Sequence, residues 1–186
     1  SRGLGDVYKR QSNTARISLG VDEVWWLVAP QNRLKSSMEM ENFDKRLSYA
    51  RLFTNELPYI KVLDIEEKNK LYASYMTINF LNSKSQKVKF IWLMGSDILE
   101  NFNRWLYPTS IAKNMYVAVI SRPGFSSSFL NTPQTTKLGK RLKTSKSKSI
   151  FLRKKPVWVF IKNKLLLISS SEIRRVHNLN KTEFQI

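Results

Sequence analysis

Short apolar runs that alternate with helix-like segments constrain the fold of this chain more than any other feature. Residues 24–29 (VWWLVA), 88–94 (VKFIWLM) and 116–120 (YVAVI) are apolar at almost every position. Such runs predict strands that are buried on both faces of a sheet. Because helix-like segments separate the runs, we expect right-handed crossovers and a parallel sheet with helices on both faces, an α/β fold.

The weaker patterns agree with that interpretation. Residues 12–19 have the spacing of a helix end, which Gly20 would terminate. The tryptophans at 25, 26 and 92 lie within strand runs, so they are expected in the core. Further strands are expected at residues 59–65 and 156–161, an ordered segment at 165–168, and helices or helical turns at 42–55, 75–81, 97–105 and 111–114.

The charge of the chain is large and unevenly placed. Residues 1–100 contain 15 basic and 12 acidic residues, whereas residues 101–171 contain 14 basic residues and no acidic one. Residues 126–155 are polar, basic and turn-rich, which predicts a flexible surface loop or insertion. The basic surface of residues 101–171 either attracts polyanions such as nucleoside triphosphates, RNA or anionic membrane, or is only a lysine-rich solvated face.

Composition excludes several kinds of site. The chain has no cysteine, which rules out disulfides, thiolate zinc sites and a cysteine nucleophile, and its one histidine, His177, cannot form an imidazole cluster for a metal. At 186 residues and 42% hydrophobic, the chain fits one domain with a single core. Since no apolar stretch approaches the roughly 18 residues of a membrane-spanning helix, and the N-terminus lacks a signal-like region, we expect a cytoplasmic protein.

The first eleven residues, SRGLGDVYKRQ, do not continue the pattern. They lack an initiating methionine and a clear periodicity, and they resemble the translated read-through of a cloning linker. We therefore expect a non-native segment at 1–11, a domain at 12–175, a C-terminal tail at 176–186, and a native N-terminus that has been lost.

Polar, basic or conformationally permissive residues follow the predicted strands. Ligands of open parallel sheets bind outside the carboxyl ends of the strands, and helix N-termini beside Lys or Arg bind anions. The residues at these ends are Pro30, Gln31, Asn32 and Lys35, then Gly95, Ser96 and Asp97, then Arg122, Pro123 and Gly124, and finally residues 169–174. An anionic ligand such as a nucleotide is therefore expected there.

Four motifs carry a resemblance to a known family. The runs VWWLVAPQNRLK, FIWLMGSDILENFNRW, VAVISRPG and ISSSEIR, in this order, resemble bacterial nicotinate-nucleotide adenylyltransferases over residues 12–175. That family has a Rossmann-like fold and joins ATP to nicotinate mononucleotide, giving nicotinate adenine dinucleotide and pyrophosphate in NAD biosynthesis. The resemblance implies ATP and nicotinate mononucleotide as partners, with Mg²⁺ carried by the ATP phosphates.

The resemblance also implies roles for the residues that match the family. For ATP, it implies that Gly95 and Asp97 meet the adenosine, that Arg122 lies near the adenine, and that Ser170, Ser171 and Arg174 grip the phosphates. For the nicotinate nucleotide, it implies binding by Asn32, Lys35, Ser74 and Thr77, with Trp105 stacked on the pyridine ring. Arg33, Leu71 and Ser171 depart from the residues that the family usually has.

One family element does not occur in the 186 residues: an opening strand and its Gly-Ser-Phe-x-Pro-x-His-x-Gly-His phosphate loop. Its histidines stabilise charge on the transferring phosphate, and such chemistry depends on positioning and electrostatics. We therefore expect that this chain retains no catalytic residue of the family and turns over poorly. The missing strand is central in the family, so unpaired backbone is expected in the sheet.

Two other functions remain open. A non-catalytic nucleic-acid-binding module could use residues 101–171, although aromatic residues are sparse between Phe129 and Phe151 and no RNA-binding signature is present. Another nucleotidylyltransferase of the same fold, such as a pantetheine-phosphate enzyme, fits less well with the paired tryptophans and ISSSEIR. A homo-oligomer is left open, whereas a membrane partner is not expected and nucleic acid is disfavoured.

Overall fold

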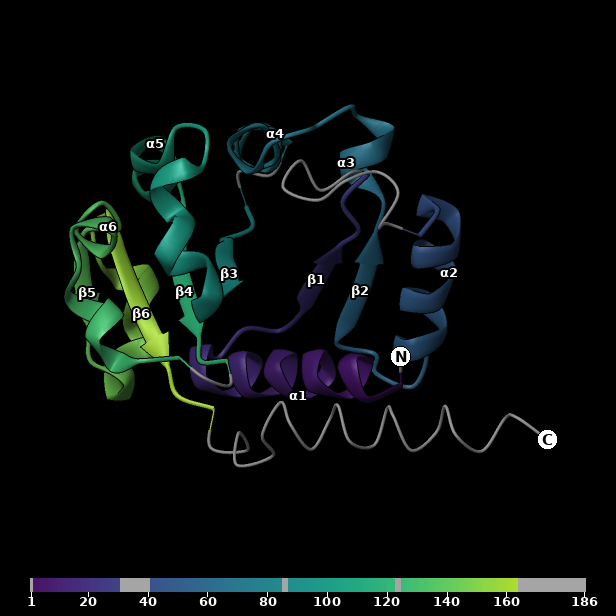
Figure 1. Cartoon of the computed structure of the whole chain (residues 1–186), viewed down its shortest axis with the longest axis horizontal. Coiled ribbons are helices and arrows are strands. Elements are labelled where there is room, and N and C mark those ends of the chain that lie inside the picture. The colour runs from purple at the N-terminus through teal and green to yellow at the C-terminus, as the bar shows by residue number, and fades with distance from the viewer. Residues whose placement is uncertain (1, 31–40, 85–86, 123–124, 164–186) are drawn as a thin grey trace.

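The computed structural model describes residues 2–30, 41–84, 87–122 and 125–163, and its strands form two half-sheets (Figure 1). The first half-sheet contains β1 (Val24–Leu27) and β2 (Ile60–Leu63). The second contains β3 (Ile91–Gly95), β4 (Tyr116–Ile120), β5 (Lys140–Leu142) and β6 (Val157–Ile161), in the order β3-β4-β6-β5. Every strand pair is parallel, so the predicted α/β class is confirmed.

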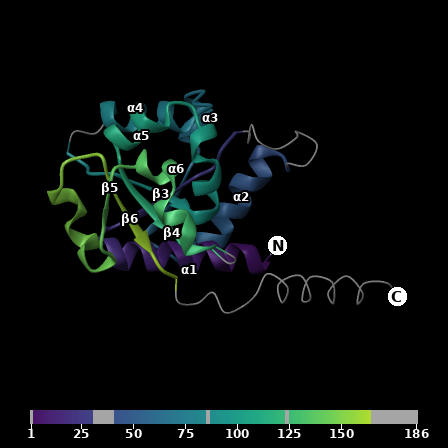
Figure 2. The same cartoon turned by 60° about the vertical axis from the view of Figure 1, so that its left-hand side comes forward.

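Helices connect the strands and cover the four-stranded half-sheet on both sides. They are α1 (Arg2–Leu19), α2 (Phe43–Thr54), α3 (Ile65–Lys68), α4 (Ser74–Lys84), α5 (Pro108–Asn114) and α6 (Pro133–Thr136), with 3₁₀ helices η2 (Ser96–Arg104), η3 (Ser127–Asn131) and η4 (Thr144–Leu152). Figure 2 shows β3, β4 and β6 between α1 on one side and α4 and α5 on the other. The segment predicted as a helix at 97–105 is thus a 3₁₀ helix.

The two faces of β4 pack into two different cores, as its apolar sequence predicts. Val117 and Val119 join a core with side chains from α4, η2 and α5, and Phe102 in η2 is fully buried there. Ala118 and Ile120 join a second core with α1 and η4. Since β4 lies between β3 and β6, both its edges and both its faces are covered.

The expectation that the run at 24–29 is buried on both faces is wrong. Trp25 in β1 is 37% exposed, and Trp26 is only half-buried. The reason is that β1 pairs with β2 alone among the described strands, so its other edge has no neighbouring strand to cover it. Trp92 in β3 is likewise half-buried, although it packs against the core that contains Phe102. Among the described residues, one edge of β1 and one edge of β3 pair with no other strand.

The N-terminal residues and the segment that begins at Ser12 belong to one helix. Helix α1 runs without interruption from Arg2 to Leu19, so residues 2–11 form one helix with the predicted helix end at 12–19. Gly20 ends the helix as predicted, with φ at +66° and its N–H 2.9 Å from the carbonyl of Arg16. The last turns of α1 bury Ala15 against the four-stranded half-sheet.

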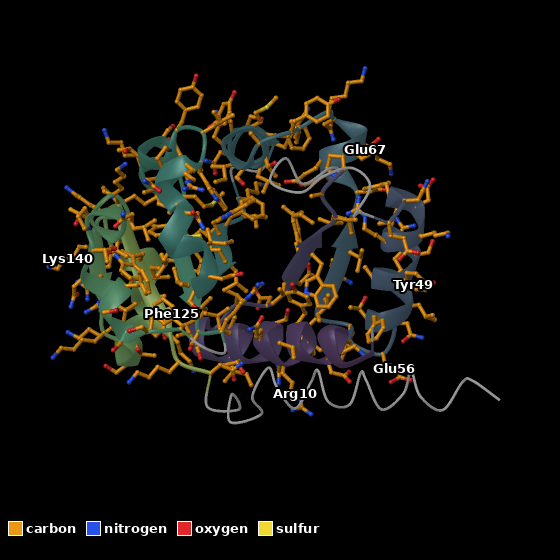
Figure 3. All side chains as sticks on the ribbon, viewed as in Figure 1. Arg10, Tyr49, Glu56, Glu67, Phe125 and Lys140 are labelled. Carbon is orange, nitrogen blue, oxygen red and sulfur yellow. The ribbon has the colours of Figure 1, made fainter. Side chains whose placement is uncertain are left out.

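The basic segment at 126–155 is structured instead of forming the expected loop. It contains η3, α6, the edge strand β5 and η4. Three apolar residues, Leu138, Leu142 and Ile150, are buried, whereas the lysines between them are exposed. The sparse apolar positions therefore anchor the segment, and the basic side chains point outward, as Lys140 does at the outer edge in Figure 3.

None of the helices within the described ranges combines the length and the apolar character that crossing a bilayer requires.

Candidate functional site

A cavity of about 880 Å³ lies between the two half-sheets. Residues of α1, β1 and β3 form nearly half of its wall, and Figure 1 shows β1 and β3 on opposite sides of this space. Four of the residues to which the sequence assigned substrate contacts also line it: Ser74, Gly95, Trp105 and Arg122. Segments that are distant in the sequence thus meet at one concave site, which is typical of ligand pockets.

The carboxyl ends of β3 and β4 hold an ion pair at this cavity. Arg122 follows β4, and its Nη1 lies 2.6 Å from Oδ2 of Asp97, in the first turn of η2. The backbone N–H of Arg122 donates to the Ser96 hydroxyl at 2.9 Å, which fixes the two strand ends to each other. Asp97 is 52% exposed and Arg122 30% exposed, so both remain accessible to a ligand.

Gly95 provides the space in which this pair sits. A Cβ atom at this position would lie 2.5 Å from Oδ1 of Asp97 and would overlap Nε of Arg122. The guanidinium of Arg122 also lies 5.3 Å from the ring centroid of Tyr8, which comes from α1. The cluster therefore combines the backbone of a glycine, which has no side chain, with one carboxylate, one guanidinium and one aromatic ring.

Trp105 and Ser74 line the cavity with an aromatic ring and a hydroxyl group. Trp105 is half-buried, packs against the core, and lies 5.6 Å from the Phe102 ring with the planes tilted by 48°. Ser74 begins α4, and its neighbour Tyr75 contacts Tyr107 edge to face at 4.8 Å. An indole face and a hydroxyl are thus available to a flat, partly polar ring.

Thr77 does not reach the cavity. It is fully buried, and its hydroxyl donates to Oε1 of Glu66 at 2.8 Å. Glu66 itself lines the cavity, and its burial raises the pKa of that carboxyl above the ordinary value of 4.5, while the Thr77 hydrogen bond opposes this change. Sequence reasoning missed Glu66, because in the run IEEK it looks like an ordinary exposed helix residue.

Five predicted site residues lie outside the described residues, so the structure places none of them: Asn32, Lys35, Ser170, Ser171 and Arg174. In the first half-sheet, the residues that follow β1 are nevertheless fixed to α2. Arg46 in α2 donates to the carbonyl groups of Ala29 at 2.8 Å and of Pro30 at 2.9 Å.

Within the described ranges, no three or more His, Cys, Asp or Glu side chains gather closely enough to hold a metal ion. The charged side chains described at or beside the cavity include Arg122, Asp97 and Glu66.

The sequence matches known proteins over most of its length. Residues 13–176 match the cytidylyltransferase-like family. The chain is 32% identical to the probable nicotinate-nucleotide adenylyltransferase of Agrobacterium fabrum, over 86% of this chain and 85% of that protein. It is 39% identical to the protein of the same name from Parvibaculum lavamentivorans, over 65% of this chain and 60% of that protein.

The fold also matches a solved structure. The nicotinic acid mononucleotide adenylyltransferase of Plasmodium falciparum, complexed with NaAD, superposes with a TM-score of 0.62 at 18% identity, covering 94% of this chain and 82% of that one. At that identity the likeness shows the fold alone, whereas the sequence relatives show the family. The chain belongs to the cytidylyltransferase-like family and, within it, to the nicotinate-nucleotide adenylyltransferases.

Proposed function

We propose that this protein acts on ATP and nicotinate mononucleotide, transferring the adenylyl group to form nicotinate adenine dinucleotide and pyrophosphate in NAD biosynthesis. One observation supports this most: Gly95, Arg122, Ser74 and Trp105 line a single cavity, although the family resemblance alone assigned them to the two substrates. The names of the sequence relatives agree with this activity.

The ATP part of the proposal rests on the ion-pair cluster. The exposed Asp97 carboxylate can accept hydrogen bonds from ribose hydroxyls, and the absence of a side chain at Gly95 lets a base or sugar approach the backbone. Because Arg122 now covers Gly95, we propose that it shifts toward the adenine when ATP binds. Ser170, Ser171 and Arg174 are proposed to hold the phosphates, as the resemblance implies.

The nicotinate part rests on Trp105 and its surroundings. We propose that its indole stacks on the pyridine ring, that Ser74 hydrogen-bonds near it, and that Asn32 and Lys35 border both substrates. Thr77 takes a positioning role, because its hydroxyl is committed to Glu66 and only Glu66 faces the cavity.

In the reaction, a phosphate oxygen of nicotinate mononucleotide attacks the α-phosphorus of ATP, and the bond to the β-phosphate oxygen breaks as pyrophosphate leaves. The protein's contribution is to align the two nucleotides and to place positive charge beside the phosphates. Magnesium is proposed to arrive on the triphosphate, and no step assigned to a protein residue depends on it. A cytoplasmic location is proposed, because ATP is supplied there.

Calorimetric titration with ATP and with nicotinate mononucleotide tests this proposal. Asp97→Asn should weaken ATP binding by roughly 10- to 100-fold, since a hydrogen bond to a charged group contributes about 1.5–3 kcal/mol, and should leave nicotinate mononucleotide binding unchanged. Glu67→Gln is the matched control, because Glu67 is an exposed α3 carboxylate at the outside of the molecule (Figure 3). Equal ATP affinity of the Asn variant and the wild type would refute the assignment.

A further inference from the structure

A dense run of positive charge lies in residues 137–155, at the side of the four-stranded half-sheet where β5 forms the edge. The run contains nine lysine or arginine residues and no acidic residue, and all nine are exposed. Within the described ranges, no ion pair involves any of the nine. β5 is the strand of this half-sheet that lies farthest from β3, as Figure 1 shows. β5 and η4 hold the segment in place, so the unbalanced charge has a fixed position.

Six cations gather at the amino ends of β4, β5 and β6. Residues 153–155 (RKK) shortly precede β6, and Lys140 begins β5, where its N–H donates to the Pro156 carbonyl at 3.3 Å. Nζ of Lys155 donates to the carbonyl of Asn114, just before β4, at 2.7 Å. These contacts join the three strand ends into one surface. We call it the basal surface, and its cations, all exposed, are Lys113, Lys137, Lys140, Arg153, Lys154 and Lys155.

The basal surface is separate from the proposed substrate site. Because β3, β4, β5 and β6 are all parallel, their amino ends lie at one end of the half-sheet and their carboxyl ends at the other. The ion pair of Arg122 and Asp97 follows the carboxyl ends of β4 and β3. The two ends of β4 are roughly 13 Å apart, since a strand rises about 3.3 Å per residue. None of the six basal cations lines the cavity between the half-sheets.

The chemistry of this surface fits phosphate groups better than bases. Neighbouring parallel strands lie about 4.8 Å apart, so the six cations can meet a polymer whose charges are closely and regularly spaced, as in a nucleic-acid duplex. The neighbouring rings of Tyr116 and Trp158 are not free to stack on bases, because Lys155 Nζ lies 5.3 Å from the Tyr116 ring centroid and Trp158 is buried. Sparse aromatic residues argue against single-strand binding, which uses stacking, but not against phosphate contacts.

An anionic membrane fits the basal surface less well. Leu152, which is 81% exposed, is the only residue of 137–155 that exposes a large apolar side chain. Binding at a membrane interface scales with the apolar area that enters the lipid, and one leucine supplies little of it. The observations therefore favour a duplex over a lipid surface.

We propose that the basal surface binds the phosphate backbone of double-stranded nucleic acid without reading its sequence. Lysine and arginine side chains that neutralise phosphates release the counterions around the duplex, which supplies the affinity and makes it depend on salt. This binding goes beyond the proposed transferase function and uses the opposite end of the half-sheet.

Fluorescence anisotropy with a labelled DNA duplex of mixed sequence tests the proposal. If all six cations meet phosphates, the logarithm of the affinity should fall with the logarithm of the salt concentration at a slope of about −5, which is about 10³-fold between about 50 and 200 mM salt. A duplex of unrelated sequence should bind equally well. One of its single strands should bind at least about 5-fold more weakly, because its charge density is lower.

Two charge-matched variants locate the binding. Arg153→Gln with Lys154→Gln removes two exposed basal cations and should weaken duplex binding at least 10-fold at about 50 mM salt and reduce the slope by about 2. Arg51→Gln with Lys45→Gln is the control, because it removes the same charge from α2, where Asp64 and Glu41 pair with these residues. The control should bind the duplex within about 2-fold of the wild type, and both variants should keep its melting temperature.

Four results would overturn the proposal. They are absence of duplex binding at about 50 mM salt, equal weakening in the two double variants, single-strand binding as tight as duplex binding, and at least 10-fold weakening by Arg122→Gln, which would place the duplex at the cavity. Vesicles of phosphatidylglycerol and phosphatidylcholine test the other source of phosphate. Tighter binding to these vesicles than to the duplex, lost in Leu152→Ser, would also overturn the proposal and assign the surface to a membrane.

Discussion

Gly95→Ala separates a binding role of the ion-pair cluster from a purely structural one. The backbone of Gly95 has φ −75° and ψ 154°, an extended conformation that alanine adopts freely. The added methyl group would instead overlap Arg122 and Asp97, whose ends have to move. The substitution therefore fills the space that the proposed adenosine contact requires without straining the chain.

The expected change in stability is small. Replacing glycine in a compatible conformation stabilises by about 0.4–1 kcal/mol, and loss of a partly exposed ion pair costs about 0–1 kcal/mol. These contributions nearly cancel, so the melting temperature should stay within about 4 °C of the wild type. A methyl group forced into a ligand contact costs about 1–3 kcal/mol, which weakens ATP binding by roughly 5- to 150-fold.

Thermal unfolding and calorimetric titration with ATP measure the two quantities on the same samples. Gly20→Ala is the control, because Gly20 has φ +66° and its Cβ would have ordinary space, with Lys148 Cγ at 3.4 Å. That variant should lose about 1–2 kcal/mol of stability and keep its ATP affinity. Unchanged ATP binding by Gly95→Ala would refute the adenosine assignment. A loss of more than about 3 kcal/mol of stability in that variant would refute the argument that the flexible ends move aside.

Three further predictions concern stability and activity. Burial raises the pKa of Glu66 in the folded state above 4.5, so the wild type loses stability as the pH rises from that value through the folded pKa. Glu66→Gln should remove this loss in unfolding titrations from pH 4 to 8. Parallel dependence of stability on pH in the two proteins would contradict this prediction. Ile150→Ala should cost about 2–5 kcal/mol in denaturant unfolding, because Ile150 in the basic segment is fully buried in the core beside β4 and β6, whereas the same change in a flexible loop would cost little. A polypeptide of these 186 residues, which contain no Gly-Ser-Phe-x-Pro-x-His-x-Gly-His loop, should release pyrophosphate from ATP and nicotinate mononucleotide orders of magnitude more slowly than relatives that carry the loop, and comparable rates would contradict the role assigned to the loop histidines.

Much of the fold could be predicted because apolar runs report directly on burial. The sequences of β4 and β6 are apolar at every position, and both strands are covered on both faces. Helix α2 could also be predicted, because Asn42 precedes apolar residues at helical spacing. In the structure the Asn42 side chain caps the helix by accepting a hydrogen bond from the N–H of Asp44 at 2.8 Å.

The remaining features depend on contacts that no local pattern contains. Trp25 is exposed because β1 pairs with β2 alone among the described strands, and this pairing depends on sheet order. The order of the basic segment follows from isolated apolar residues such as Leu138 that find a distant core. The role of Glu66 depends on Thr77, eleven residues away, and on the cavity beside it.

The most direct test of the account is binding of nicotinate adenine dinucleotide, because this product spans both proposed substrate positions. Titration into the wild type should give one-site binding that raises the melting temperature, and both Asp97→Asn and Trp105→Ala should weaken it at least 10-fold, in contrast to Glu67→Gln. No binding of the dinucleotide, together with RNA binding that falls steeply with salt, would contradict the account and favour a nucleic-acid-binding module.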